Sequence, residues 1–104
     1  MRYAVAIENV KTFSIGIKGF AFVHATAGRR DVCVRPVADA DEALQVAARV
    51  RTVGYKPIFG VVVDDCFYDV LELRYYHPEL YSSEVKAFFT KCRSQREEIQ
   101  KCGK

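Results

Sequence analysis

The stretch ADADEALQVAARVRTVGYKP, residues 38–57, decides the fold because it marks one helix between two groups of strands. Asp39 can accept hydrogen bonds from the first-turn amides, and Glu42 stands three residues later, as in a capping box. Gly54 suits a left-handed C-terminal cap, and Pro57 prevents the helix from continuing. The apolar residues of one helical stripe are Ala43, Val46, Ala47, Val50 and Val53. The pattern predicts an amphipathic helix that ends before Gly54.

The residues before this helix have the composition of β-strands. In residues 3–8 large apolar residues alternate with small ones, which predicts a strand with one large face and one small face. Residues 9–12 are typical of a hairpin connection. Residues 13–25 are strand-like throughout but contain Gly16 and Gly19, and after a turn at 26–31 a third strand is predicted up to Pro36.

The residues after the helix predict two strands and a second helix. The short apolar run 58–63 indicates a central strand buried on both faces, and the turn Asp64–Asp65–Cys66 follows it. Apolar residues alternate again in 67–76, which predicts another strand. The last helix is expected to begin near Ser82 or Ser83. One side of it carries Val85, Phe88, Phe89 and Cys92.

These elements predict one α+β domain over residues 1–104, with the order ββ(β)αββα. We expect a single mainly antiparallel sheet with two helices on one face, ferredoxin-like or a permuted variant of it. Half of the residues are hydrophobic and 28% are charged, which is typical of a compact domain. The polar end at 93–104 is expected to fray.

Charge and cysteine content argue against several functional classes. The net charge is only +3, whereas a dedicated nucleic-acid binder has a denser basic stripe. The four cysteines include no C-x-x-C pair, so neither a zinc knuckle nor a redox pair is indicated. Neither a secretory signal nor a bilayer-spanning run is found. We therefore expect a cytoplasmic protein with no cofactor, no metal and no catalytic residues.

The stretch KGFAFVHA, residues 18–25, resembles the signature strand of RNA recognition motifs, K/R-G-F/Y-G/A-F-V-x-F/Y. In that family a first strand and a full helix precede the signature, and a second helix follows it. Here residues 1–17 contain strand and turn patterns only, and a further strand follows. The family itself is therefore not predicted.

The same stretch still has two physical interpretations. If 13–25 is one continuous strand, one face carries Lys18, Phe20, Phe22 and His24, an aromatic platform with a cation and an imidazole. If Gly16–Gly19 forms a turn, the phenylalanines can enter the core instead. A third possibility is that the platform faces a second copy, because helices would leave the other sheet face uncovered. We expect a homodimer formed through sheet faces or strand edges.

A second resemblance covers residues 34–59 and the DVLEL that begins at Asp69. They are similar to one βαβββ half of a glyoxalase/bleomycin-resistance domain. The matching features are Asp39, Glu42, Ala43, Gly54, Tyr55 and the triplet Leu71-Glu72-Leu73. The resemblance implies that Glu72 would be a metal ligand in a small metal-dependent enzyme. A thiol enzyme would instead combine one of the cysteines with His24 or His77.

The leading prediction is a small non-catalytic binding or assembly protein. Its ligand would be a small organic molecule in an aromatic-lined cleft, or a protein partner. The predicted contact residues are Lys18, Phe20, Phe22, His24, Tyr68, Tyr75 and Tyr76. One alternative is single-stranded nucleic-acid binding through Lys18, Phe20 and Phe22, helped by Arg29, Arg30 and Arg35. The other alternative is the metal- or thiol-dependent enzyme.

Overall fold

The computed structural model describes the backbone of residues 1–8, 19–26 and 30–102, and the side chains of 1–7, 19–20 and 32–93. These residues form an α+β domain with an antiparallel sheet, as the sequence predicts. Its elements are β1 (Arg2–Glu8), β2 (Ala21–Thr26), β3 (Arg30–Pro36), α1 (Ala40–Thr52), β4 (Ile58–Val63), β5 (Cys66–Asp69), α2 (Val70–Tyr76), the 3₁₀ turn η2 (Pro78–Leu80) and α3 (Ser83–Cys102). The described residues thus hold three α-helices, where two were expected.

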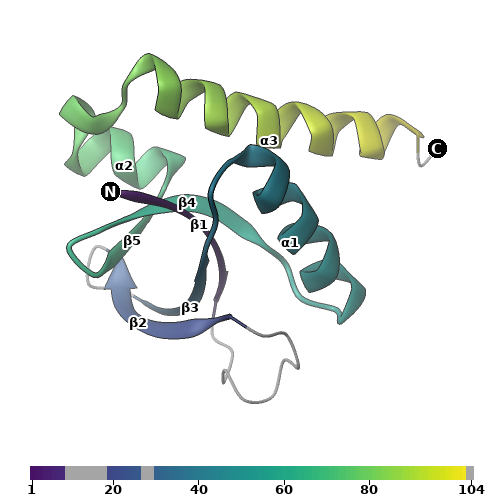
Figure 1. Ribbon diagram of the computed structural model, residues 1–104, viewed down its shortest axis with the longest axis horizontal. Coiled ribbons are helices and arrows are strands. Elements are labelled where there is room, and N and C mark those ends of the chain that lie inside the picture. Colours follow the sequence, from purple (N-terminus) through teal and green to yellow (C-terminus); the bar gives the residue numbers. More distant parts are fainter. Residues whose placement is uncertain (9–18, 27–29, 103–104) are drawn as a thin grey trace.

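The sheet has the strand order β2-β3-β1-β4-β5, and every neighbouring pair is antiparallel. The predicted ferredoxin-like order is not confirmed. The sheet curls strongly, so that Cα atoms of β2 and β5, the two ends of the order, come within 8 Å of each other. Figure 1 shows the strands as a partly closed ring below the helices.

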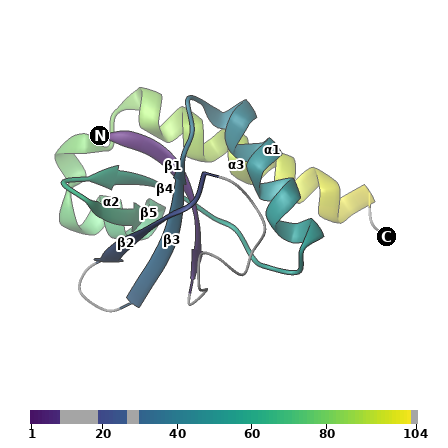
Figure 2. The ribbon, with the colours of Figure 1, turned by 60° about the horizontal axis from the view of Figure 1, so that its bottom comes forward.

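The helices cover the outer face of this curled sheet (Figure 2). Val5 and Ile7 of β1 and Val61 of β4 meet the apolar stripes of the helices there, which we call the helix-side core. Its helical members include Ala43, Val46, Val50, Leu73, Val85, Phe88, Phe89 and Cys92. The stripes predicted for α1 and α3 are confirmed except at Val53, which follows the last turn of α1 and is exposed.

The inner face of the sheet encloses a second, smaller core that consists of Ala4, Ala6, Val32, Val34 and Phe67. The phenyl ring of Phe67 is fully buried. A Cβ atom at Gly60 would collide with the backbone oxygen of Tyr68 and with the Phe67 ring, so only glycine fits there. The sheet face that we expected to be uncovered is therefore buried, because the sheet curls around it.

The start of α1 has the predicted cap. Asp39 Oδ1 accepts the backbone N–H of Glu42 at 2.9 Å, and Glu42 Oε1 accepts the N–H of Ala38 at 2.6 Å. Beyond the helix, Gly54 has φ +89°, the left-handed conformation for which glycine is suited. The helix of the sequence prediction is thus confirmed at both ends.

The strand predicted over residues 67–76 is wrong after Asp69, where α2 begins instead. Asp69 Oδ1 accepts the N–H of Glu72 at 2.8 Å, and Glu72 Oε1 accepts the N–H of Asp69 at 3.1 Å, a complete capping box. The apolar residues do not share one face as a strand would require. Leu73 is fully buried, whereas Leu71 and Tyr75 are 71% and 78% exposed.

The interpretation of residues 13–25 as one continuous strand was one of two alternatives, and it does not hold at residues 19–20, since β2 begins at Ala21; residues 13–18 lie outside the described residues. Gly19 has φ +93° and lies in a turn, which agrees with the turn interpretation at that glycine. The predicted turn after β4 is a two-residue hairpin in which Asp64 and Asp65 have φ +49° and +64°, as in a type I′ turn.

Candidate functional site

Three of the predicted contact residues lie together. Tyr68 belongs to β5, and Tyr75 and Tyr76 form the last turn of α2. The ring centroids of Tyr68 and Tyr76 are 6.3 Å apart, and those of Tyr75 and Tyr76 are 4.8 Å apart in an edge-on arrangement. Tyr75 and Tyr76 are both exposed. We call these three rings the aromatic surface.

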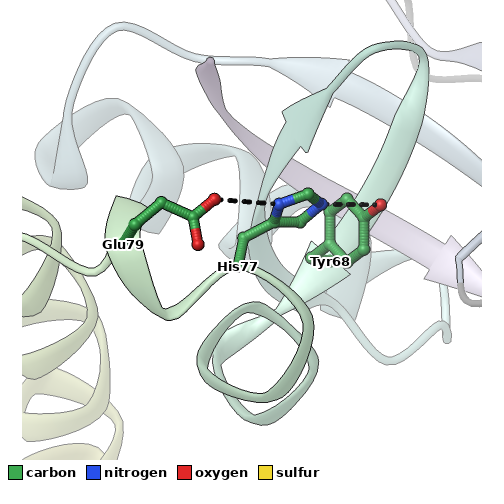
Figure 3. Close-up of polar contacts among 3 residues, drawn as sticks. All are labelled: Tyr68, His77 and Glu79. Carbon is green, nitrogen blue, oxygen red and sulfur yellow. Dashed lines mark hydrogen bonds and ion pairs between the residues drawn. The ribbon is translucent and has the colours of Figure 1, made fainter.

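His77 joins this surface to a carboxylate (Figure 3). Its Nε2 lies 3.2 Å from the Tyr68 hydroxyl, and its Nδ1 lies 3.3 Å from Glu79 Oε2. An ionised carboxylate only accepts hydrogen bonds, so the Nδ1–H of His77 donates the hydrogen bond to Glu79. In the neutral ring Nε2 then accepts the Tyr68 O–H. The imidazole thus fixes the phenol at one end and the carboxylate at the other.

The electrostatics of this group favour a protonated phenol and an ionised carboxylate. Burial, followed by the nearby Cys66, Asp64 and Glu72, raises the pKa of Tyr68. The backbone amide of Glu79 and then His77 lower the pKa of the Glu79 carboxyl. His77 also ends α2, since its N–H donates to the carbonyl of Leu73 at 2.8 Å. The arrangement therefore fastens the end of α2 to β5.

The other predicted contact residues lie elsewhere. Lys18 and Arg29 are outside the described residues. Phe22 and His24 lie in β2, and Arg30 is the first residue of β3; the structure describes their backbone but not their side chains. The backbone of Phe22 pairs with that of the buried Cys33. Phe20 is partly buried and packs on the helix-side core, and the half-buried Arg35 lies against Gly19. None of the described ring contacts joins Phe20 to the aromatic surface.

A cleft of about 600 Å³, which we call the helix cleft, lies on the other side of α2. Its walls come from α2, α3 and residues 55–57, and its floor comes from the ends of β1 and β4. Ile7, Phe59 and Phe89 supply apolar surface in its interior. Volumes of about 300–1,000 Å³ are usual for sites that bind small organic molecules.

The rim of the helix cleft is positively charged. Lys56, Arg74 and Arg93 come from three different elements and line the same opening. The Arg74 guanidinium lies over the Tyr81 ring, 5.4 Å from its centroid, which holds the cation in place. Leu71, which is 71% exposed, adds apolar surface to the α2 wall. No motif connects the positions of Lys56, Arg74 and Arg93, so they could not be identified from the sequence.

A second hollow of about 620 Å³ lies at the start of β1 and the starts of α1 and α3. Its charged lining residues are Arg2, Glu42 and Glu84, and Glu42 already caps α1. The charges there are mixed, whereas those of the helix cleft mostly share one sign. The helix cleft is therefore the better defined candidate site.

Cys33 and Cys92 are poorly suited to act as nucleophiles, and Glu72 already has a structural role. Burial raises the pKa of Cys33, and raises that of Cys92 to about 12, so these thiols stay protonated at neutral pH. Among the described residues no group of three His, Cys, Asp or Glu side chains is placed to hold a metal ion. Glu72, the candidate ligand of the glyoxalase resemblance, is part of the capping box of α2.

No protein-family model, curated protein or solved structure matches this chain. Within the part of the chain that the structure describes, no helix is both long and apolar enough to cross a bilayer. The helix cleft and the aromatic surface, which both lie beside α2, are therefore the two candidate sites.

Proposed function

We propose that this is a small cytoplasmic binding protein without catalytic activity, whose ligand is a small organic molecule held in the helix cleft. The observation that carries the proposal is the combination, in one cleft of about 600 Å³, of an apolar interior with a rim of cationic side chains. A mostly apolar cavity with a few convergent polar groups is the usual form of a small-molecule site.

The test is a ligand screen followed by amide chemical-shift mapping. Small organic acids and neutral aromatic compounds are added at about 1 mM, a concentration at which even weak binders are detected. Binding is expected to shift the amides of α2, residues 55–59 and the middle of α3. If nothing binds, or if the shifts lie outside these segments, the proposal is wrong.

A pair of tryptophan variants on α3 locates the ligand. Thr90 lines the helix cleft and is exposed, so Thr90→Trp is expected to fill the cleft and abolish binding. Ala87 is equally exposed on the same helix but does not line the cleft, and Ala87→Trp is expected to bind normally. Equal effects of both variants would contradict this location.

Homodimer formation, expected from the sequence, remains part of the proposal. The described surface best suited to it is the outer side of α2, where Tyr75 and Tyr76 expose large aromatic side chains. Sedimentation velocity of the wild type and of Tyr75→Ser/Tyr76→Ser is the test. If the double variant is still a dimer, the interface lies elsewhere. If the wild type is a monomer, the dimer prediction is wrong.

A further inference from the structure

We infer that the ligand of the helix cleft is an amphipathic monocarboxylate, an organic acid with an elongated apolar body and one carboxylate head. This inference rests on the proposed function, since it specifies which class of molecule the cleft would select. It is carried by the distribution of charge and apolar surface around the cleft.

The apolar part of the ligand is indicated by the interior. Ile7 and Phe89 are buried in the helix-side core, and the half-buried Phe59 and Val70 extend that surface into the cleft. Leu71 continues it outward on the α2 wall, although 71% of its own surface is exposed. A ligand that covers the exposed parts of Phe59, Val70 and Leu71 removes apolar surface from water, which favours binding by about 25 cal/mol per Å².

The anionic head is indicated by the charged lining residues. Lys56 lies in the segment before β4, Arg74 on α2 and Arg93 on α3, so cations approach the opening from three elements. Among the described lining residues Asp69 alone carries a carboxylate, and that group accepts the N–H of Glu72. The positive charges of Lys56 and Arg74 are thus complementary to an anion.

Arg74 is the residue best placed to bind the head group. Its guanidinium carbon lies over the Tyr81 ring, 5.4 Å from the centroid, a cation–π contact that favours this position of the side chain. The N–H groups at the edge of the guanidinium plane can donate two parallel hydrogen bonds to a carboxylate. Thr90, on the α3 wall, adds a hydroxyl donor to the same opening.

A single negative charge fits the cleft better than two. The Asp69 carboxylate, which accepts the N–H of Glu72, lines the cleft beside the cations. The apolar interior favours a head group that loses less hydration on binding.

Calorimetric titration with three ten-carbon probes tests the inference: decanoate, the neutral decanol and the dianionic decyl phosphate. Decanoate is expected to bind at least about tenfold more tightly than decanol, since a hydrogen bond to a charged group contributes about 1.5–3 kcal/mol. Decyl phosphate is expected to bind more weakly than decanoate. Tighter binding of decyl phosphate would overturn the monocarboxylate assignment.

Charge-neutral variants locate the head group. Arg74→Gln is expected to weaken decanoate binding about tenfold and to leave decanol binding unchanged. Arg51→Gln is the matched control, because Arg51 is an exposed arginine in the last turn of α1 and does not line the cleft. Circular dichroism of each variant checks that the fold is retained.

The outcomes separate this inference from the proposed function. If decanoate and decanol bind equally and Arg74→Gln changes neither, the ligand class is wrong although the cleft still binds organic molecules. If neither the ten-carbon probes nor any compound of the wider screen binds, both the ligand class and the proposed function are wrong.

Discussion

Helices α1 and α2 begin in the same way and are then held by different means. In both, an aspartate cap accepts the N–H of a glutamate three residues later, at 2.9 Å for Asp39 and 2.8 Å for Asp69. Beyond this cap α1 runs for 13 residues and buries five of them. In contrast, α2 has seven residues and buries Leu73 alone.

The difference shows that α1 is stabilised by packing along its length, whereas α2 is stabilised mainly at its ends. The capping box fixes the first turn of α2, Leu73 anchors its middle, and His77 connects its last turn to Tyr68. Both candidate surfaces, the helix cleft and the aromatic surface, are built on α2. These candidate surfaces thus lie on a helix with one buried residue, and elements with few buried contacts often form binding sites.

The largest expected effect comes from removing the one buried anchor of α2. Leu73→Ala should lower the free energy of unfolding by about 3 kcal/mol and also detach α2 locally. Val50→Ala, at a fully buried position of α1, should cost about 2 kcal/mol and leave α1 helical, because four other residues stay buried. Urea unfolding and amide hydrogen exchange measure the two effects. A larger cost for Val50→Ala would contradict the comparison.

The caps provide a second test of the comparison. Asp69→Ala is expected to cost about 1.5 kcal/mol and Asp39→Ala about 1 kcal/mol, since the shorter helix has less packing to compensate for the lost cap. Amide exchange in α2 should accelerate strongly in Asp69→Ala, while exchange in the middle of α1 should change little in Asp39→Ala. Equal local acceleration in both helices would show that α2 does not depend more on its cap.

Removal of the link at the C-terminal end of α2 should have a smaller effect. Tyr68→Phe keeps the ring but loses the hydrogen bond to His77 Nε2, so it should cost about 1 kcal/mol in urea unfolding at pH 7. Tyr75→Phe removes an exposed hydroxyl and serves as the control with no expected change. If the two variants are equally stable, the link contributes nothing.

The smallest expected effect is a dependence on pH. The folded state lowers the pKa of Glu79 below its ordinary value of 4.5, so its contribution is present above that value and is lost as the pH falls through the lowered pKa. Thermal unfolding should therefore show wild type slightly more stable than Glu79→Gln at pH 7. The two proteins should converge near pH 3. His77→Gln should remove part of the difference at pH 7, because the backbone amide of Glu79 is the larger cause of the lowered pKa and His77 the second. An unchanged difference would assign the effect to that amide alone.

The same two helices show how far the sequence predicts the fold. For α1 the cap, the stripe at every third or fourth residue and Gly54 all agree, so the helix could be placed closely. For α2 the apolar residues alternate, as in a strand, and only the aspartate and glutamate at 69 and 72 indicate a helix. The hydrogen bonds of that cap, together with the burial of Leu73, outweigh the alternating pattern.

The curl of the sheet and the helix cleft were less accessible to prediction. Ala4 and Ala6 gave β1 a small-residue face, but the sequence did not show that Phe67 would fill the space beside them. The cations of the cleft are distant in sequence and meet only when α2 and α3 pack over β4. Tyr68, Tyr75 and Tyr76 were three of the seven predicted contact residues, but the predicted strand would have placed Tyr75 on the face opposite the other two.

The curl of the sheet has a further consequence, which concerns aggregation. An open sheet presents unpaired N–H and C=O groups on its two outer strands, and these can recruit strands of other molecules. Here β2 and β5 face each other across the ring, so each edge obstructs access to the other. A chain rich in β-branched and aromatic residues is thereby protected from forming intermolecular sheets at high concentration.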